Sequence, residues 1–482
     1  MLLVAAAFGV GAARATPPNI VLVSVDGLRA DRVGAYGNHP SPTPGLDRLA
    51  ADGLMCDVAL SQSNESLFSH ASILTGRHPS ELAPPDYHTF VVPKSALLIP
   101  EILAVYGYAR AAFVAGGHVK GVYGFNQGFD PYWDDADFGA FFHTVPQALS
   151  WLAESPREPF FMFLHGYDTH RPYLHAGLYY HPFDGDYKGD VDEILQQSRI
   201  ERVVDGNYYA DFPFQYFWHA GAAERILDPA GYGRLRDYAR THTGKPVTPR
   251  DELHIRAHYD TGALSADLQL SRFVESLQAS GAWAHTLMLV LADHGEDLGD
   301  HGFYNHRSSL SDSATRVPMI FAGGALPASL RGKHIAGMCS AVDVAPTLLH
   351  AAGAVLPPDL PGRDLLSDAP APPYIIQEGV LPMLAVRTAT HRLNVQGLPL
   401  DSPLFELLVR VAPIASPTFT LYDLVYDPGE KVDVLQAQPD VARTLRGYLL
   451  DWLGQRKAGA RAEGGPALDP KFREMLRERG YW

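Results

Sequence analysis

The chain has 482 residues, of which 46% are hydrophobic and 19% are charged. This composition is typical of a globular protein and excludes a mainly disordered or fibrous chain. Lys and Arg number 39 against 54 Asp and Glu, which leaves a formal net charge of −15. We therefore expect no nucleic-acid partner, because phosphate binding requires clustered positive charge.

The N-terminal segment 1–15 (MLLVAAAFGVGAARA) is apolar and ends in an A-x-A pattern, Ala13-Arg14-Ala15. This pattern predicts a secretory signal peptide without its charged start, and hence export to the periplasm or the medium. No other segment approaches the roughly 18–20 apolar residues that span a bilayer, so we expect no transmembrane segment. The two cysteines, Cys56 and Cys339, cannot form a disulfide framework, although one bridge is left open.

Short apolar runs that alternate with helical patterns predict an α/β fold with a mostly parallel central sheet. The clearest apolar runs are continuous, as expected for strands covered on both faces of a sheet. The predicted strands are Ile20–Val25, Ala111–Ala115, Phe160–Leu164, Leu287–Leu291 and Pro318–Ala322. One long helix is predicted to follow the capping box at Thr248 and Asp251 and to stop near Gly281.

Two stretches interrupt this pattern. The aromatic run Asn207–Trp218, within 175–247, indicates either a lid or substrate wall, or a small hydrophobic cluster under a long loop. The Pro-rich stretch 355–374 predicts a boundary between a main domain of about 19–370 and a smaller unit of about 371–482. In the smaller unit we expect strands and a final helix, at Tyr374–Ile376, Leu384–Thr388, Arg392–Val395 and near Pro439–Trp452.

Charged side chains follow two of the predicted strands. Asp26 ends the first strand, and Asp293 and His294 end the fourth. Because residues just past the ends of parallel strands share one edge of the sheet, these groups should meet there. Two carboxylates and one imidazole suit Ca²⁺, Mg²⁺ or Mn²⁺, and the histidine also allows Zn²⁺.

Ser66, in SNESLFSHASILTGRHP, lies at or just before a predicted helix N-terminus. Backbone N–H groups there favour an anionic ligand, and a nearby metal would allow the hydroxyl to attack a sulfuryl or phosphoryl centre. Taken alone, a serine at such a position is also an ordinary helix cap.

With these residues in view, the chain resembles the sulfatase family of the alkaline-phosphatase-like superfamily. Four segments carry the resemblance: NIVLVSVDGLRADRVGAYGNHPSPTPGLDRLAADG, SLFSHASILTGRHP, PFFMFLHGYDTHRPY and ADHGEDLGDHGFYNHRSSLSDSATRVPMIFAGG. The later segment LYDLVYDPGEKVDVL is similar to the C-terminal signature of the family, which implies a small α+β subdomain with an antiparallel sheet.

The resemblance assigns roles to individual positions. It implies one divalent cation, Ca²⁺ before the alternatives, and a nucleophile that is also a ligand; the implied ligands are Asp26, Ser66, Asp293 and His294. His170 and His306 fall where the family contacts the transferring group or the leaving oxygen, which implies catalytic roles. The substrate contacts implied are His118 and His70, the latter in place of a family arginine.

The chain also departs from the family pattern. The modification signature Cys/Ser-x-Pro-x-Arg reads Ser66-Leu67-Phe68-Ser69-His70 here, which argues against conversion of Ser66 to formylglycine. Gly27 stands where many sulfatases carry a second acidic ligand. This combination is similar to superfamily members that use an unmodified serine or threonine.

The resulting hypothesis is a sulfuric ester hydrolase that acts on a small-molecule or glycan sulfate ester. One alternative is a phosphate or phosphonate monoesterase, or a phosphoglycerol-type transferase, of the same superfamily. Another is a non-catalytic relative that binds sulfated or phosphorylated glycans. The oligomeric state is left open.

Overall fold

The computed structural model describes residues 17–82, 90–136, 138–154, 156–171, 173, 182–189, 191–192, 248–301, 304–379, 383–396 and 419–460. The predicted signal peptide and the aromatic run Asn207–Trp218 lie outside these residues. Among the helices described, none combines the length and hydrophobicity needed to cross a bilayer.

Within the described residues, nine strands form one mixed sheet in the order β4-β3-β5-β1-β6-β8-β2-β7, with β9 paired to β2. Their bounds are β1 Asn19–Val25, β2 Leu54–Leu60, β3 Ala109–Phe113, β4 Tyr132–Trp133, β5 Phe160–Gly166, β6 Thr286–Leu291, β7 Arg316–Val317, β8 Met319–Ala322 and β9 Lys333–Ser340. The central strands β3, β5, β1 and β6 run parallel, which confirms the predicted mostly parallel sheet.

The strands predicted from apolar runs are present, with small shifts. Every residue of β1, β5 and β6 is buried, as expected for strands covered on both faces. The second predicted strand ends two residues earlier than expected, at Phe113. The strand β8 is antiparallel to both of its neighbours, β6 and β2.

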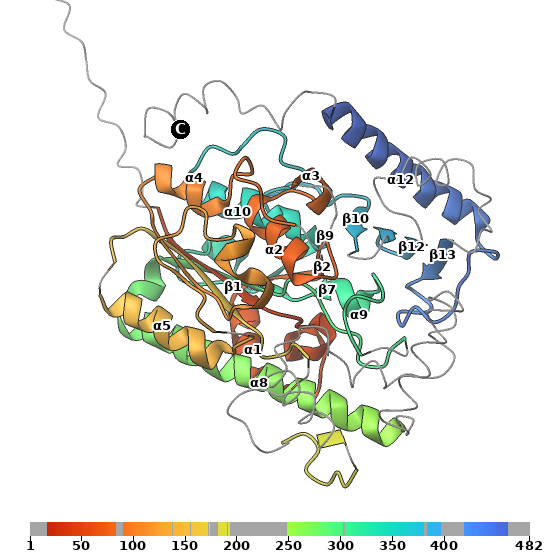
Figure 1. Cartoon of the computed structure of the whole chain (residues 1–482), viewed down its shortest axis with the longest axis horizontal. Helices are drawn as coiled ribbons and strands as arrows, with labels where there is room; N and C mark the ends of the chain where they lie inside the picture. The colour runs from red at the N-terminus through yellow and green to blue at the C-terminus, as the bar shows by residue number, and fades with distance from the viewer. Residues whose placement is uncertain are drawn as a thin grey trace, which may run out of the picture.

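Helices cover both faces of the sheet (Figure 1). On one face, α1 (Pro44–Asp52) and α5 (Phe141–Ala153) pack against α8 (Pro249–Ala279). On the other face lie α2 (Ser66–Thr75), α4 (Ile99–Val105) and α10 (Val344–Ala351). Two short helices, α3 (Pro79–Leu82) and α9 (Asp312–Thr315), also belong to the described part of the main body.

The long helix α8 begins as predicted. The Thr248 side chain accepts a hydrogen bond from the backbone of Asp251, and the Asp251 side chain accepts one from the backbone of Thr248. Pro249 occupies the first turn, where its missing N–H costs nothing. Beyond the helix, Gly281 adopts a left-handed conformation with φ 82°, which terminates the helix.

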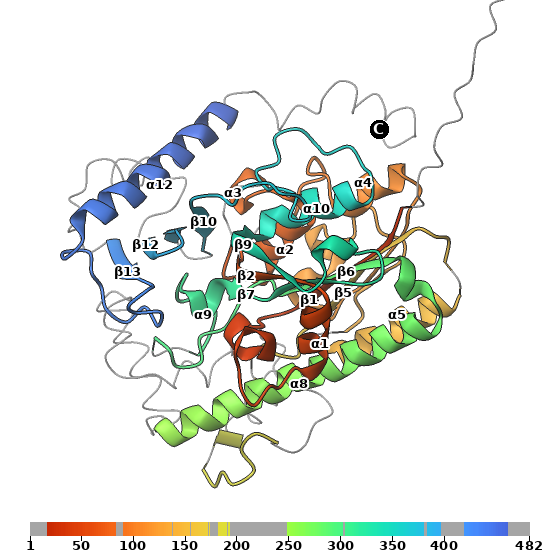
Figure 2. The ribbon, with the colours of Figure 1, turned by 180° about the vertical axis from the view of Figure 1, so that it is seen from behind.

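A second sheet of four described strands is antiparallel throughout, in the order β10-β11-β12-β13. Its strands are β10 Ile375–Glu378, β11 Met383–Arg387, β12 His391–Gln396 and β13 Phe419–Asp423, and α12 (Pro439–Ala460) packs on it through a separate hydrophobic cluster. Figure 2 shows this unit beside the main sheet.

The second sheet contacts the segment that leads to Ser66. The Gln62 side-chain amide donates a hydrogen bond to the backbone carbonyl of Ile376 (2.9 Å). The backbone carbonyl of Gln62 accepts a hydrogen bond from the backbone N–H of Glu378 (2.8 Å). These bonds connect β10 to the chain four residues before Ser66. The smaller unit therefore supports the start of α2.

The two cysteines lie on neighbouring strands, Cys56 on β2 and Cys339 on β9. Both are buried free thiols, so the disulfide left open by the sequence is not formed.

Candidate active site

The parallel strands β1 and β6 bring the predicted cation ligands together. Asp26 directly follows β1, and Asp293 and His294 follow β6 by two and three residues. The His294 Nε2 atom lies 3.4 Å from Asp293 Oδ2 and 3.8 Å from Asp26 Oδ1. All three side chains are fully buried at the carboxyl edge of the sheet.

Ser66 reaches the same point from the other face. It is the first residue of α2, and its Oγ lies 3.1 Å from His294 Nε2. Every residue of α2 is buried, in keeping with a sequence that, apart from His70, is apolar or small all around the helix. The helix dipole therefore points its positive end at the carboxylate cluster from within the protein.

The donor set fits a cation. Asp26 Oδ1 and Asp293 Oδ2 are buried and have no hydrogen-bond partner among the described residues. His294 donates from Nδ1 to the carbonyl of Gly295 (2.8 Å), which leaves the Nε2 lone pair directed at the cluster. A buried carboxylate without a partner is costly, so these atoms indicate a positively charged ligand.

The pKa values of the two carboxylates, Asp26 and Asp293, are shifted in opposite directions. Burial, and then the charge of Asp293, raise the pKa of Asp26 well above its ordinary value. Burial would also raise the pKa of Asp293, but His294, His70 and His165 lower it below the ordinary value. Like charges held this close in a buried site favour a cation between them.

Two buried histidines lie behind the carboxylates. His70 donates from Nδ1 to the carbonyl of Ser66 (2.8 Å) and accepts at Nε2 from Ser24 Oγ (3.0 Å). His165 Nε2 lies 3.4 Å from Asp26 Oδ2, and its ring meets His70 edge to face. Burial lowers the pKa of both imidazoles below the ordinary value.

Two of the predicted histidines, His118 and His306, lie beside another acidic residue, Glu65, to which no role was assigned from the sequence. His118 Nδ1 lies 2.8 Å from Glu65 Oε1, and Arg307 pairs with the other carboxylate oxygen. His306 Nε2 lies 3.6 Å from Glu65 Oε2. Burial alone would raise the pKa of Glu65, but Arg307 and the histidines hold it well below its usual range.

His306 lies against His294 of the carboxylate cluster, and His170 lies next to His306. The His306 ring stacks on His294 with centroids 4.2 Å apart, and His170 lies 5.2 Å from His306. His306 Nδ1 also lies 3.2 Å from Glu296 Oε2. Burial alone would lower the pKa of His306, but Glu296 and Glu65 raise it above its ordinary value.

Glu296, to which no role in the site was assigned from the sequence either, lies beside Gly27. Gly27 has φ +73°, and a Cβ there would lie 3.8 Å from Glu296 Oε2. The Gly27 N–H donates to Asp293 Oδ1 (3.1 Å). A carboxylate from the loop after β6 thus stands next to the position where many sulfatases carry their second acidic ligand. The only sequence signal was its place three residues after Asp293.

Asp168, by contrast, faces away from this cluster. Its carboxylate accepts hydrogen bonds from the Phe141 backbone (2.8 Å) and from Ser265 Oγ (3.1 Å). Arg29 forms ion pairs with Asp31 and with Asp300.

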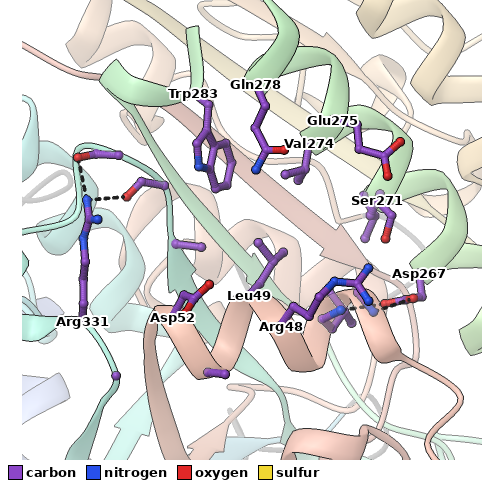
Figure 3. A pocket seen from close by; sticks show the side chains of 18 residues that line it. Arg48, Leu49, Asp52, Asp267, Ser271, Val274, Glu275, Gln278, Trp283 and Arg331 are labelled. Atoms are coloured by element: carbon purple, nitrogen blue, oxygen red, sulfur yellow. Dashed lines mark hydrogen bonds between the residues drawn. The ribbon is translucent and has the colours of Figure 1, made fainter. Parts of the chain in front are cut away.

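A separate cavity of about 680 Å³ lies between α1 and α8 and is lined by Asp52, Asp267, Trp283 and Arg331 among others. Figure 3 shows these side chains around it. Trp283 precedes β6, so this cavity lies at the sheet edge opposite to Asp293. It is not part of the site described above.

The sheet carries carboxylates and a histidine at its carboxyl edge, where ligands bind in α/β folds, opposite a serine at a helix N-terminus. The sequence profile of the Sulfatase family matches residues 18–354. The chain therefore belongs to the sulfatase family of sulfuric ester hydrolases.

Two relatives come from Bacteroides thetaiotaomicron. An N-acetylglucosamine-6-O-sulfatase is 23% identical over 417 residues, which cover 72% of this chain and 70% of the relative. A delta 4,5-hexuronate-2-O-sulfatase is 22% identical over 491 residues, with 96% and 94% covered.

Two solved structures share the fold. A 2-O GAG sulfatase superposes with a TM-score of 0.68 at 19% identity and covers 95% of this chain and 96% of its own. The phosphonate monoester hydrolase of Agrobacterium radiobacter superposes with a TM-score of 0.64 at 18% identity, with 92% and 96% covered. These likenesses confirm the predicted alkaline-phosphatase-like fold.

Proposed function

We propose that the protein hydrolyses sulfate esters with Ser66 as the nucleophile, beside a single divalent cation. The observation that carries this proposal is the position of Ser66 Oγ, 3.1 Å from His294 Nε2, at a cluster with two unpartnered buried carboxylate oxygens. The proposed ligands are Asp26, Ser66, Asp293 and His294. Their oxygen-rich set favours Ca²⁺, with Mg²⁺, Mn²⁺ and Zn²⁺ as alternatives.

When bound, such a cation would lower the pKa of the Ser66 hydroxyl and offset negative charge on the ester oxygens. Ser66 Oγ loses its proton to solvent and, as the alkoxide, attacks sulfur; an Oγ–S bond forms and the S–O bond to the alcohol breaks. The departing oxygen takes a proton from His306 or His170. Water then attacks sulfur and gives one proton to the histidine and the other to Ser66 Oγ as the Oγ–S bond breaks, which releases sulfate and restores the Ser66 hydroxyl.

His306 and His170 differ in the groups that contact their ring nitrogens. His306 is buried between Glu296 and Glu65, so a protonated imidazole is paired on both sides. His170 donates from Nδ1 to the backbone carbonyl of Arg171 (2.7 Å), which leaves Nε2 as an acceptor in its neutral form. We assign proton donation to His306 and contact with the transferring group to His170.

We assign substrate contact to His118, which is partly exposed beside Glu65, and retain His70 as a further candidate. Both nitrogens of His70 already face Ser24 and the Ser66 carbonyl. Its contacts favour an orienting role on Ser66.

We propose that Ser66 acts unmodified, because the segment from Ser66 to His70 lacks the proline and arginine of the modification signature. The mass of a proteolytic peptide that covers Ser66 tests this. An unchanged mass is expected, and a loss of two hydrogens would instead indicate formylglycine and a gem-diol nucleophile.

For the substrate we propose a sulfate ester on a sugar, since the relatives are named for sulfated sugar units. The test is turnover of aryl and sugar sulfates against aryl phosphate and phosphonate esters, with each of the four cations. Faster turnover of phosphonate esters would favour the alternative that the shared fold of the phosphonate hydrolase suggests. Cation binding without turnover of any ester would indicate a non-catalytic glycan-binding relative.

We also propose that residues 1–15 direct export, and that 19–370 and 371–482 are the catalytic and the smaller C-terminal unit. N-terminal sequencing of the mature protein tests the first, and limited proteolysis near 355–374 tests the second.

A further inference from the structure

A second group of metal-ligand side chains lies on α8, apart from the residues of the proposed active site. His254 and His258 are four residues apart and so share one side of the helix. Asp192 Oδ1 lies 2.8 Å from His254 Nε2 and 2.7 Å from His258 Nε2. One ligand atom from each residue lies within 4.8 Å of the others.

We propose that Asp192, His254 and His258 bind a second divalent cation of the zinc class. Two imidazoles and one carboxylate are a ligand set that zinc accepts readily, with a fourth position for water. Both histidines are buried, whereas the Asp192 side chain is 42% exposed, which provides a path from solvent.

The surroundings of His254 favour a cation over a simple polar contact. Its Nδ1 lies 2.7 Å from Asp184 Oδ2, and the Tyr187 ring stacks on it at 3.7 Å. With Nδ1 donating its N–H to Asp184, the Nε2 lone pair is available to a cation held together with Asp192. A carboxylate behind a ligating histidine is also the usual support of a metal site.

The site would hold a surface segment against α8. Figures 1 and 2 both show the yellow segment around 182–192 beside the first turns of α8. Val191 packs in a hydrophobic cluster with Tyr259, whose hydroxyl donates to the Gly27 carbonyl (2.6 Å). The cation would thus fasten the segment 182–192 next to the helix residue that supports the Gly27 turn.

The experiment measures zinc bound to the full chain after chelation and dialysis against ZnCl₂, by elemental mass spectrometry. It uses Asp293→Asn as the parent, so that the proposed catalytic site is disabled and its failure is distinguishable. The parent should retain one zinc per chain, and the double variants Asp293→Asn/His258→Gln and Asp293→Asn/Asp192→Asn should retain none. The control His334→Gln, in the same parent, removes an exposed histidine paired with a single aspartate, and should retain one zinc.

A second readout does not depend on stoichiometry. Titration of the parent with CoCl₂ should give the visible absorption of four-coordinate cobalt, and His258→Gln should abolish it while far-UV circular dichroism stays unchanged. A parent that binds no zinc, or double variants that bind as much as the parent, would overturn the proposal. The cluster would then be an ion pair between Asp192 and protonated histidines.

Discussion

The most informative single change is Asp293→Asn, which removes one of two buried carboxylates while keeping the size of the side chain. Unit charges 4 Å apart interact by about 4 kcal/mol at an effective dielectric of about 20, and a divalent cation in direct contact interacts more strongly. Since about 1.4 kcal/mol is a factor of ten, cation affinity should fall by roughly 1,000-fold or more. The asparagine Oδ1 can still accept from the Gly27 N–H, so the backbone support is retained.

The assay has two parts. Thermal unfolding is followed with and without CaCl₂ at about 100 times the wild-type Kd, where binding should stabilise the wild type by about 2.7 kcal/mol and the variant by almost nothing. The rate of aryl sulfate hydrolysis should fall by at least about 1,000-fold, because the cation is required for the chemistry. The control Asp52→Asn makes the same change at the opposite sheet edge and should alter neither quantity. A variant that keeps its calcium stabilisation and a rate within tenfold of wild type would refute the cation site.

Three further changes test other parts of the site. Ser66→Ala should lower kcat by at least about 1,000-fold with the protein still folded, whereas a loss below tenfold would make Ser66 only a helix residue. Arg307→Gln leaves the buried Glu65 with weaker compensation and should lower the unfolding free energy by about 2 kcal/mol in urea titrations; no change would show that Glu65 does not depend on Arg307. Burial alone would lower the pKa of His301, but Asp297 raises it to about 9. The ion pair between His301 and Asp297 therefore stabilises the fold fully below pH ~6.5, and this stabilisation is lost as the pH rises through 9. His301→Gln should therefore destabilise by about 1–3 kcal/mol at pH 6 and by little at pH 10, and an equal effect at both would contradict this ion pair.

The smaller C-terminal unit contacts the segment of the chain that leads to Ser66. Gln62 joins β10 to the chain before Ser66. Arg392 of β12 is fully buried and pairs with Asp312 and Glu430. The N-terminus of α2 is therefore positioned partly by a sheet that contributes none of the proposed ligands.

Much of the fold was predictable because buried parallel strands are continuous apolar runs, whose hydrophobicity can be read without knowledge of their neighbours. The same reasoning could not give the direction of β8, since a buried strand has the same composition in either orientation. It also missed β2, where Asp57 interrupts the apolar run and lies exposed on the strand.

For the site, Asp26, Asp293 and His294 could be placed near one another from sequence alone, because strand ends share an edge. Glu296 could not be assigned, since its relation to Gly27 depends on how the loop after β6 folds back across β1. Neither could Glu65, whose role depends on the side chains that surround it.

The cluster of Asp192, His254 and His258 was likewise predictable from the sequence only in part. The four-residue spacing of His254 and His258 is visible in the sequence, because helix geometry alone brings such a pair to one side. Asp192 lies 62 residues earlier than His254 along the chain, and only the packing of its segment against α8 brings its carboxylate to the pair. Periodicity along the backbone is a local property and can be read locally, whereas contacts between distant side chains exist only once the chain has packed.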